Sequence, residues 1–126
     1  MKNTYISILL FFILVITLFF LNTKFINLCD KVIEECNVIE DLLDKNDKET
    51  SYIYSKDLLT LIIDEADIPA IYLNHVDYDL LKNDALKLTV YIKSEDKSES
   101  LATLHTLRST AEHLKELQTP NLKNLF

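Results

Sequence analysis

The stretch YISILLFFILVITLFFL, residues 5–21, decides the organisation of this chain, because none of its 17 residues is charged, glycine or proline. As an α-helix that rises about 1.5 Å per residue it spans roughly 25 Å, and Thr4 with residues 22–26 extends it to the ~30 Å hydrocarbon core of a bilayer. Only a helix satisfies every backbone polar group of a lone segment in lipid. We therefore predict a transmembrane anchor in residues 1–24 that contacts membrane lipid through residues 5–21.

The apolar stretch is distinguished from a cleaved signal peptide by its length and its flank. A signal peptide has an apolar region of about 7–15 residues followed by small residues at a cleavage site. The stretch here is longer, and residues 19–24 (FFLNTK) contain no such site. Bulky Leu28 precedes Cys29, where a lipoprotein site has a small residue. These features predict a retained signal-anchor.

The orientation of the anchor follows from its short amino-terminal tail. Lys2 lies on one side and Lys24 and Lys31 on the other, so the positive-inside rule gives only a slight bias. Four residues before the apolar stretch favour a tail inside the cell and a domain outside it. We expect a single-pass protein of the cell membrane with an extracytoplasmic helical domain.

The composition predicts an all-α fold. Glycine is absent and proline occurs only at residues 69 and 120, so the turn residues that β-rich folds need are missing. Residues 22–126 suffice for one modest domain. We predict a single transmembrane helix that continues into a small antiparallel helical bundle.

Apolar residues recur with helical spacing in four segments of this domain. They predict helices over about 25–44, 51–67, 69–94 and 98–118 in a bundle of residues 25–119, followed by an apolar tail over 120–126. Thr50 or Ser51 is expected to cap the second helix, and Ser98 to start the last. Pro69 either separates two helices or kinks one.

Charge and missing motifs exclude several functions. The net charge is −7, and an acidic surface repels nucleic acid. Without glycine the chain has no phosphate-binding loop, dinucleotide fingerprint or Gly-x-Ser-x-Gly nucleophile turn. We expect no catalytic residues, no cofactor and no nucleic-acid partner.

Cys29 and Cys36 lie seven residues apart on one predicted helical face. Their Cα atoms are separated by about 10.5 Å along the axis, whereas a disulfide needs about 7 Å or less, so they do not bridge within one helix. They are either small core residues or the site of an intermolecular disulfide in a parallel homodimer.

His75, Asp79 and His113 form the candidate polar cluster. On a helix His75 and Asp79 share a face, and an antiparallel last helix brings His113 to the level of Asp79. Two histidines and a carboxylate could hold a divalent metal, although structural zinc normally has four ligands. A solvated or hydrogen-bonded cluster is the ordinary interpretation, so no metal is assigned.

The apolar tail ends in Leu122, Leu125 and Phe126. These side chains either seal one end of the bundle or form a short partner-binding motif.

The carboxy-terminal half resembles the small clostridial and related Gram-positive membrane proteins catalogued as domain of unknown function 4363. The matching motifs are His75-x-Asp77-x-Asp79, Tyr91-Ile92-Lys93, Asp96-Lys97, Leu101, Leu104-x-x-Leu107, His113 and Leu122-Lys123-Asn124-Leu125-Phe126. The chain departs from the family pattern in having no tryptophan, and in having Asp77 and Tyr78 where Glu and Ile are usual. The resemblance implies a membrane segment and a helical domain but no reaction, since the family has no assigned activity.

Two functions of different classes remain. The first is a non-enzymatic protein-interaction module in a membrane or envelope complex, with another membrane or envelope protein as partner. The alternative is a ligand- or metal-sensing domain centred on His75, Asp79 and His113.

Overall fold

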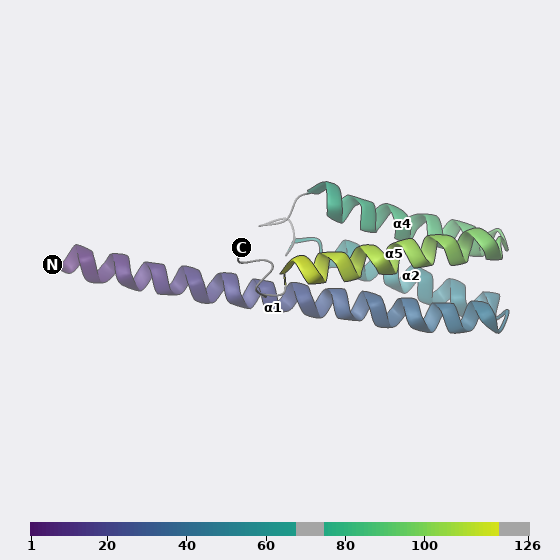
Figure 1. Cartoon of the computed structure of the whole chain (residues 1–126), viewed down its shortest axis with the longest axis horizontal. Helices are drawn as coiled ribbons and strands as arrows, with labels where there is room; N and C mark the ends of the chain where they lie inside the picture. The colour runs from purple at the N-terminus through teal and green to yellow at the C-terminus, as the bar shows by residue number, and fades with distance from the viewer. Residues whose placement is uncertain (68–74, 119–126) are drawn as a thin grey trace.

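The computed structural model describes residues 1–67 and 75–118, and these residues form helices and no strand (Figure 1). The helices are α1 (Lys2–Asp44), α2 (Lys48–Asp64), α4 (His75–Lys93) and α5 (Lys97–Gln118). The predicted all-α fold, in which a long apolar amino-terminal helix continues into a helical bundle, is confirmed.

Helix α1 is continuous over 43 residues but has two different halves. Its amino-terminal half projects alone, while α2, α4 and α5 lie alongside its carboxy-terminal half (Figure 1). Residues 1–20 are all exposed, and the first buried side chain is Phe25. Among the described residues α1 is the one helix long and apolar enough to cross a membrane, as a membrane anchor or as a signal sequence.

The bundle places α1 and α4 at opposite corners. Helix α1 packs against α2 and α5, and α4 packs against the same two helices from the other side. Each helix contributes a stripe of side chains with helical spacing, which is why the predicted amphipathic faces meet in one core. The largest fully buried side chains of this core are Phe25, Val32, Ile39, Leu58, Ile62, Leu81, Leu88, Ile92, Leu104, Leu107 and Leu114.

Two similar turns reverse the chain at the end of the bundle far from the amino terminus. Asn46 and Glu95 each adopt a left-handed backbone, with φ of 58° and 60°. The backbone N–H of the next residue donates a hydrogen bond to a carbonyl of the preceding helix. Asp47 N donates to the Leu42 carbonyl at 2.9 Å, and Asp96 N donates to the Tyr91 carbonyl at 3.0 Å. These contacts end α1 and α4 in the manner of a Schellman cap, here without glycine.

The starts of α2 and α5 differ from the expected caps. The Asp47 carboxylate accepts a hydrogen bond from Thr50 N at 3.1 Å, so α2 begins at Lys48 rather than at residue 51. The Asp96 carboxylate accepts from Glu99 N at 3.1 Å, so α5 begins at Lys97. An aspartate at the cap satisfies an otherwise unpaired N–H as well as serine or threonine does, and each aspartate occurs earlier in the chain than the residue predicted for this role.

The ends of two other predicted segments also differ or lie outside the description. Helix α2 ends at Asp64, three residues before the expected limit. The break or kink at Pro69 and the tail over 120–126, with Leu122, Leu125 and Phe126, lie outside the described residues.

A hydrogen bond marks where the bundle begins along α1. Asn22 Nδ2 donates to the carbonyl of Gln118, the last residue of α5, at 3.2 Å. The carboxy-terminal end of α5 therefore contacts α1 one residue after the apolar stretch ends. No spacer separates the apolar helix from the bundle.

Candidate functional site

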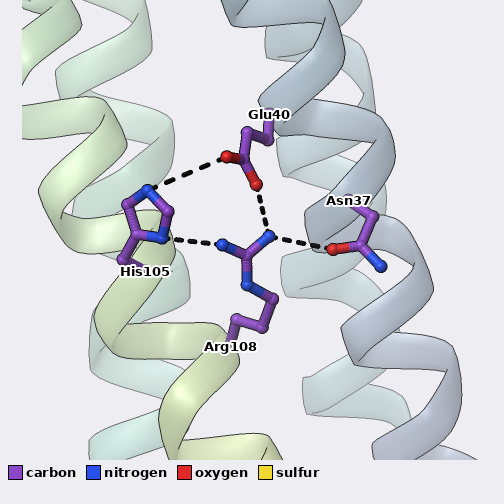
Figure 2. Close-up of polar contacts among 4 residues, drawn as sticks. All are labelled: Asn37, Glu40, His105 and Arg108. Atoms are coloured by element: carbon purple, nitrogen blue, oxygen red, sulfur yellow. Dashed lines mark hydrogen bonds and ion pairs between the residues drawn. The ribbon is translucent and has the colours of Figure 1, made fainter.

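A polar cluster joins α1 to α5 on the side of the bundle (Figure 2). Asn37 and Glu40 come from adjacent turns of α1, and His105 and Arg108 come from adjacent turns of α5, so each pair lies on one helical face. Arg108 Nη1 donates to Asn37 Oδ1 at 2.8 Å and also to Glu40 Oε2. Arg108 Nη2 lies 2.7 Å from His105 Nδ1, and His105 Nε2 lies 3.9 Å from Glu40 Oε1.

The hydrogen bonds of this cluster define the state of each member. A guanidinium group has only donors, so His105 Nδ1 is the acceptor in its contact with Arg108 Nη2. The other ring nitrogen, Nε2, faces Glu40 Oε1, but 3.9 Å is too long for a hydrogen bond. The hydrogen bond and charge of Arg108 lower the pKa of Glu40 below its ordinary value of 4.5. Arg108 contacts all three other members, so the cluster connects α1 to α5. We call these four residues, Asn37, Glu40, His105 and Arg108, the clasp.

The sequence pattern did not single out this clasp. Neither Glu40 nor Arg108 was a candidate site residue, and the candidate histidines were His75 and His113 rather than His105. One signal was available, because Arg108 is the only arginine in a chain with 12 lysines. Arginine supplies a planar fork of donors that lysine cannot replace at a site with several acceptors.

The three residues of the predicted polar cluster are not gathered into a metal site. His75 is exposed at the first position of α4, and His113 is exposed on α5. Asp79 forms an ion pair with Lys82 on its own helix at 3.6 Å. Within residues 1–67 and 75–118, no group of three or more His, Cys, Asp or Glu side chains is placed to hold a metal ion.

Both cysteines are buried in the face of α1 that packs on the other helices. Cys29 is 1% exposed and Cys36 is fully buried, and both thiols are free. Burial raises the pKa of each thiol to about 12, so both are neutral at physiological pH. Within one chain both cysteines therefore occupy core positions, and the intermolecular disulfide stays a prediction. A disulfide between two copies would require the bundle to open.

A model of the family described as domain of unknown function (DUF4363) matches residues 19–125, from the end of the apolar stretch to the penultimate residue. The chain belongs to this family. The resemblance predicted from its motifs is confirmed, and no curated protein and no solved structure matches the chain.

Two hollows lie at opposite ends of the DUF4363 bundle. The far hollow, of about 190 Å³, lies between the two turns and is lined by Leu43, Asn46, Asp47, Lys48, Ile92, Glu95, Lys97 and Ser100. Its charged groups are matched within the chain: Lys48 pairs with Glu95 at 3.2 Å, and Lys97 Nζ donates to Asn46 Oδ1 at 3.1 Å. The near hollow, of about 200 Å³, lies beside the apolar helix and is lined by Lys24, Asn27, Leu28, Lys31, Leu61 and Glu65.

Four aliphatic side chains are exposed on the outer face of α4, where they alternate with polar ones. Val76, Leu80, Leu86 and Val90 are between 51% and 61% exposed. At 100° per residue they fall within an arc of about 120°, opposite the arc whose side chains form the core. This face is directed away from α1, because α1 and α4 occupy opposite corners of the bundle.

The clasp predicts a pH dependence that Glu40→Gln removes. Because the pKa of Glu40 is lowered, its carboxylate contributes fully to the free energy of unfolding above pH 4.5, the ordinary pKa of the group. This contribution is lost as the pH falls through the lower pKa of Glu40 in the folded protein. The substitution should cost about 1 kcal/mol or less at pH 7, since the carboxylate is partly solvated. The melting temperature of the variant in detergent should fall less than that of the wild type between neutral and acidic pH. Glu34→Gln, exposed on the same helix, is the control, and an equal fall in the Glu40→Gln and wild-type proteins would contradict the clasp.

The buried cysteines predict slow modification of the native protein. A thiol reagent at neutral pH should label Cys29 and Cys36 only after the bundle is denatured, because both thiols are neutral and covered. Ser109→Cys, at an exposed position of α5, supplies one rapidly labelled thiol as a control. On a non-reducing gel the membrane-expressed protein should run at monomer mass. A band at twice that mass that reductant removes would instead establish an intermolecular disulfide.

Proposed function

We propose that this DUF4363 protein is a single-pass membrane protein whose helical domain binds another membrane or envelope protein. It acts by binding rather than by catalysis. The proposal rests on the difference between the two halves of α1. Residues 1–20 are exposed throughout, whereas the stripe of side chains that begins at Phe25 is buried in the bundle. One rigid helix thus joins a lipid-compatible segment to a folded domain.

The length of the free segment supports membrane anchoring. From Lys2 to Asn22 the helix rises about 31 Å, close to the ~30 Å hydrocarbon core of a bilayer. Every backbone group within the helix interior is hydrogen-bonded, as a lipid environment requires. In water the same segment would expose a continuous apolar surface far larger than a monomeric soluble protein tolerates.

The outer face of α4 supports a protein partner with an apolar helix. Val76 and Val90 are separated by about 21 Å along α4, and with Leu80 and Leu86 they form an exposed aliphatic stripe made of two i, i+4 pairs. Single exposed aliphatic residues are ordinary, but two such pairs on one face match the anchors by which an amphipathic helix docks on a surface. Exposed Asp79, Asn83 and Lys87 lie within the same arc, among the aliphatic side chains. The partner helix should therefore carry apolar side chains interspersed with polar and charged ones.

Fractionation with protease accessibility tests membrane anchoring and the side of the membrane on which the helical domain lies. The full chain should stay with the membrane after alkaline extraction, because its apolar helix is embedded in lipid. Protease added to intact cells should digest the helical domain, if that domain faces outward. Digestion only after the cells are permeabilised would overturn the outward orientation, and release by alkali or recovery of a shortened soluble chain would overturn the anchor.

Site-specific photo-crosslinking in native membranes tests the partner surface. A photoreactive residue at position 80 of α4 should give a discrete product, and one at position 53 should give several-fold less, although Leu80 and Ile53 are similarly exposed, at 52% and 48%. Val90→Asp should reduce the product of position 80 several-fold, because it places a charge in the docked stripe. Ile53→Asp, on α2, should leave it unchanged.

Three outcomes of this experiment would contradict the proposal. Equal products at positions 80 and 53 would show no preferred face, and no product at position 80 would show that α4 has no partner. A product of twice the 14.6 kDa chain mass would identify a second copy of the chain in place of a different protein.

A further inference from the structure

We propose that the near hollow, lined by Lys24, Asn27 and Lys31 of α1, binds the phosphate headgroup of an anionic phospholipid. The inference rests on the membrane anchoring proposed above. It assigns a ligand to a surface that lies immediately next to the predicted membrane segment.

The depth of the hollow follows from the unbroken helix. If Lys2 to Asn22 span the hydrocarbon core, Lys24 and Asn27 lie about 3 and 7.5 Å beyond its edge. The headgroup layer of one leaflet occupies about 5–8 Å, so both residues lie within or at the edge of this layer. Lys31 is about 13.5 Å beyond the edge, but side chains of a helix lean toward its amino terminus, here toward the membrane. All three side chains can therefore reach one headgroup.

The charge in the hollow is available for an anion. Residues 24, 27 and 31 share one face of α1 at spacings of three and four. Within the described residues neither Lys24 nor Lys31 forms an ion pair, whereas Lys115 at the same end of the bundle is held by Asp30 at 2.6 Å. Lys24 Nζ lies 4.8 Å above the centre of the Phe20 ring, a cation–π contact that holds the ammonium beside the lipid boundary. Among the described residues that line the hollow, Glu65, directly after α2, is the one acid.

The apolar part of the lining favours a lipid over a free phosphate ion. Leu28 and Leu61 line the hollow beside the two lysines and the amide. An inorganic ion gains nothing from leucine side chains, whereas the glycerol and first methylene groups of a lipid can contact them. The whole chain has a net charge of −7 and repels free anions, but a lipid is held in the membrane next to the site.

The far hollow is less suited to an anion than the near hollow. It also contains two lysines, but Lys48 is paired with Glu95 and Lys97 donates to Asn46. Asp47 lines it as well and caps α2. An anion there would have to displace these contacts and approach two carboxylates.

The test uses the full chain in lipid nanodiscs that contain phosphatidylcholine with a minor fraction of phosphatidylglycerol. The lipids that remain bound after transfer to detergent are counted by native mass spectrometry. The wild type should retain phosphatidylglycerol about tenfold above its share of the nanodisc, since each lysine near the surface contributes about fivefold at most. Lys24→Gln with Lys31→Gln should bring the retained lipid close to its share.

The control is Lys45→Gln with Lys56→Gln, which removes the same charge from exposed positions outside the hollow. It should retain the wild-type preference. If both double variants lose the preference equally, overall charge rather than the hollow recruits the lipid, and the inference is wrong. It is also wrong if the Lys24→Gln, Lys31→Gln protein keeps the preference.

A second arm separates the two sources of phosphate and the two proposals. Inorganic phosphate is added to the wild type in nanodiscs of phosphatidylcholine alone. The lipid assignment would be overturned by a phosphate adduct that depends on Lys24 and Lys31, if the first arm shows no preference for phosphatidylglycerol. Failure of every variant to enter nanodiscs would overturn membrane anchoring and this inference together. Normal incorporation of all variants without lipid preference would overturn this inference alone.

Discussion

The structure depends on one constraint: α1 is a single unbroken helix that must satisfy two different surroundings. Its amino-terminal half is apolar on every side, and its carboxy-terminal half is apolar on one face only. Because the hydrogen-bonded backbone continues through both halves, the position of the bundle along α1 is set by where the one-sided pattern begins, at Phe25. Under the proposed function, the same rigid helix places the bundle directly on the membrane surface.

The register of α5 on α1 is set by polar contacts as well as by the core. Asn22 bonds to Gln118, Asp30 pairs with Lys115 and Glu40 is held by Arg108, in the order expected for antiparallel helices (Figures 1 and 2). Apolar side chains alone permit helices to slide by a turn with little change in buried area, whereas a guanidinium with three neighbours does not. The clasp therefore has a structural role in specifying one arrangement, and the surfaces assigned to binding lie elsewhere, on α4 and beside Lys24.

Much of the fold could be predicted because it follows from local patterns. The spacing of Phe25, Cys29, Val32, Cys36 and Ile39 defines the buried face of α1, and the absence of glycine and the scarcity of proline favour long helices. The helix starts were predicted less well, since Asp47 and Thr50 are both good caps and the choice depends on how the preceding turn closes. The candidate site could not be predicted at all from periodicity, because Glu40 and Arg108 are 68 residues apart and each alone resembles a solvated surface residue.

By itself, the sequence determined the helical class, the apolar segment, the family and the buried faces, because these depend on residue type at fixed spacing along one helix. Tertiary structure decided which faces stay uncovered and which charges meet. Packing of α1 and α4 at opposite corners leaves the stripe from Val76 to Val90 exposed. It does not gather His75, Asp79 and His113 into a metal-holding group, although the sequence allowed them to meet, and it brings Lys24 and Lys31 beside Leu61 of another helix. Such relations depend on the rotation and offset of each helix about its neighbours, and spacing within a single helix contains no information about either.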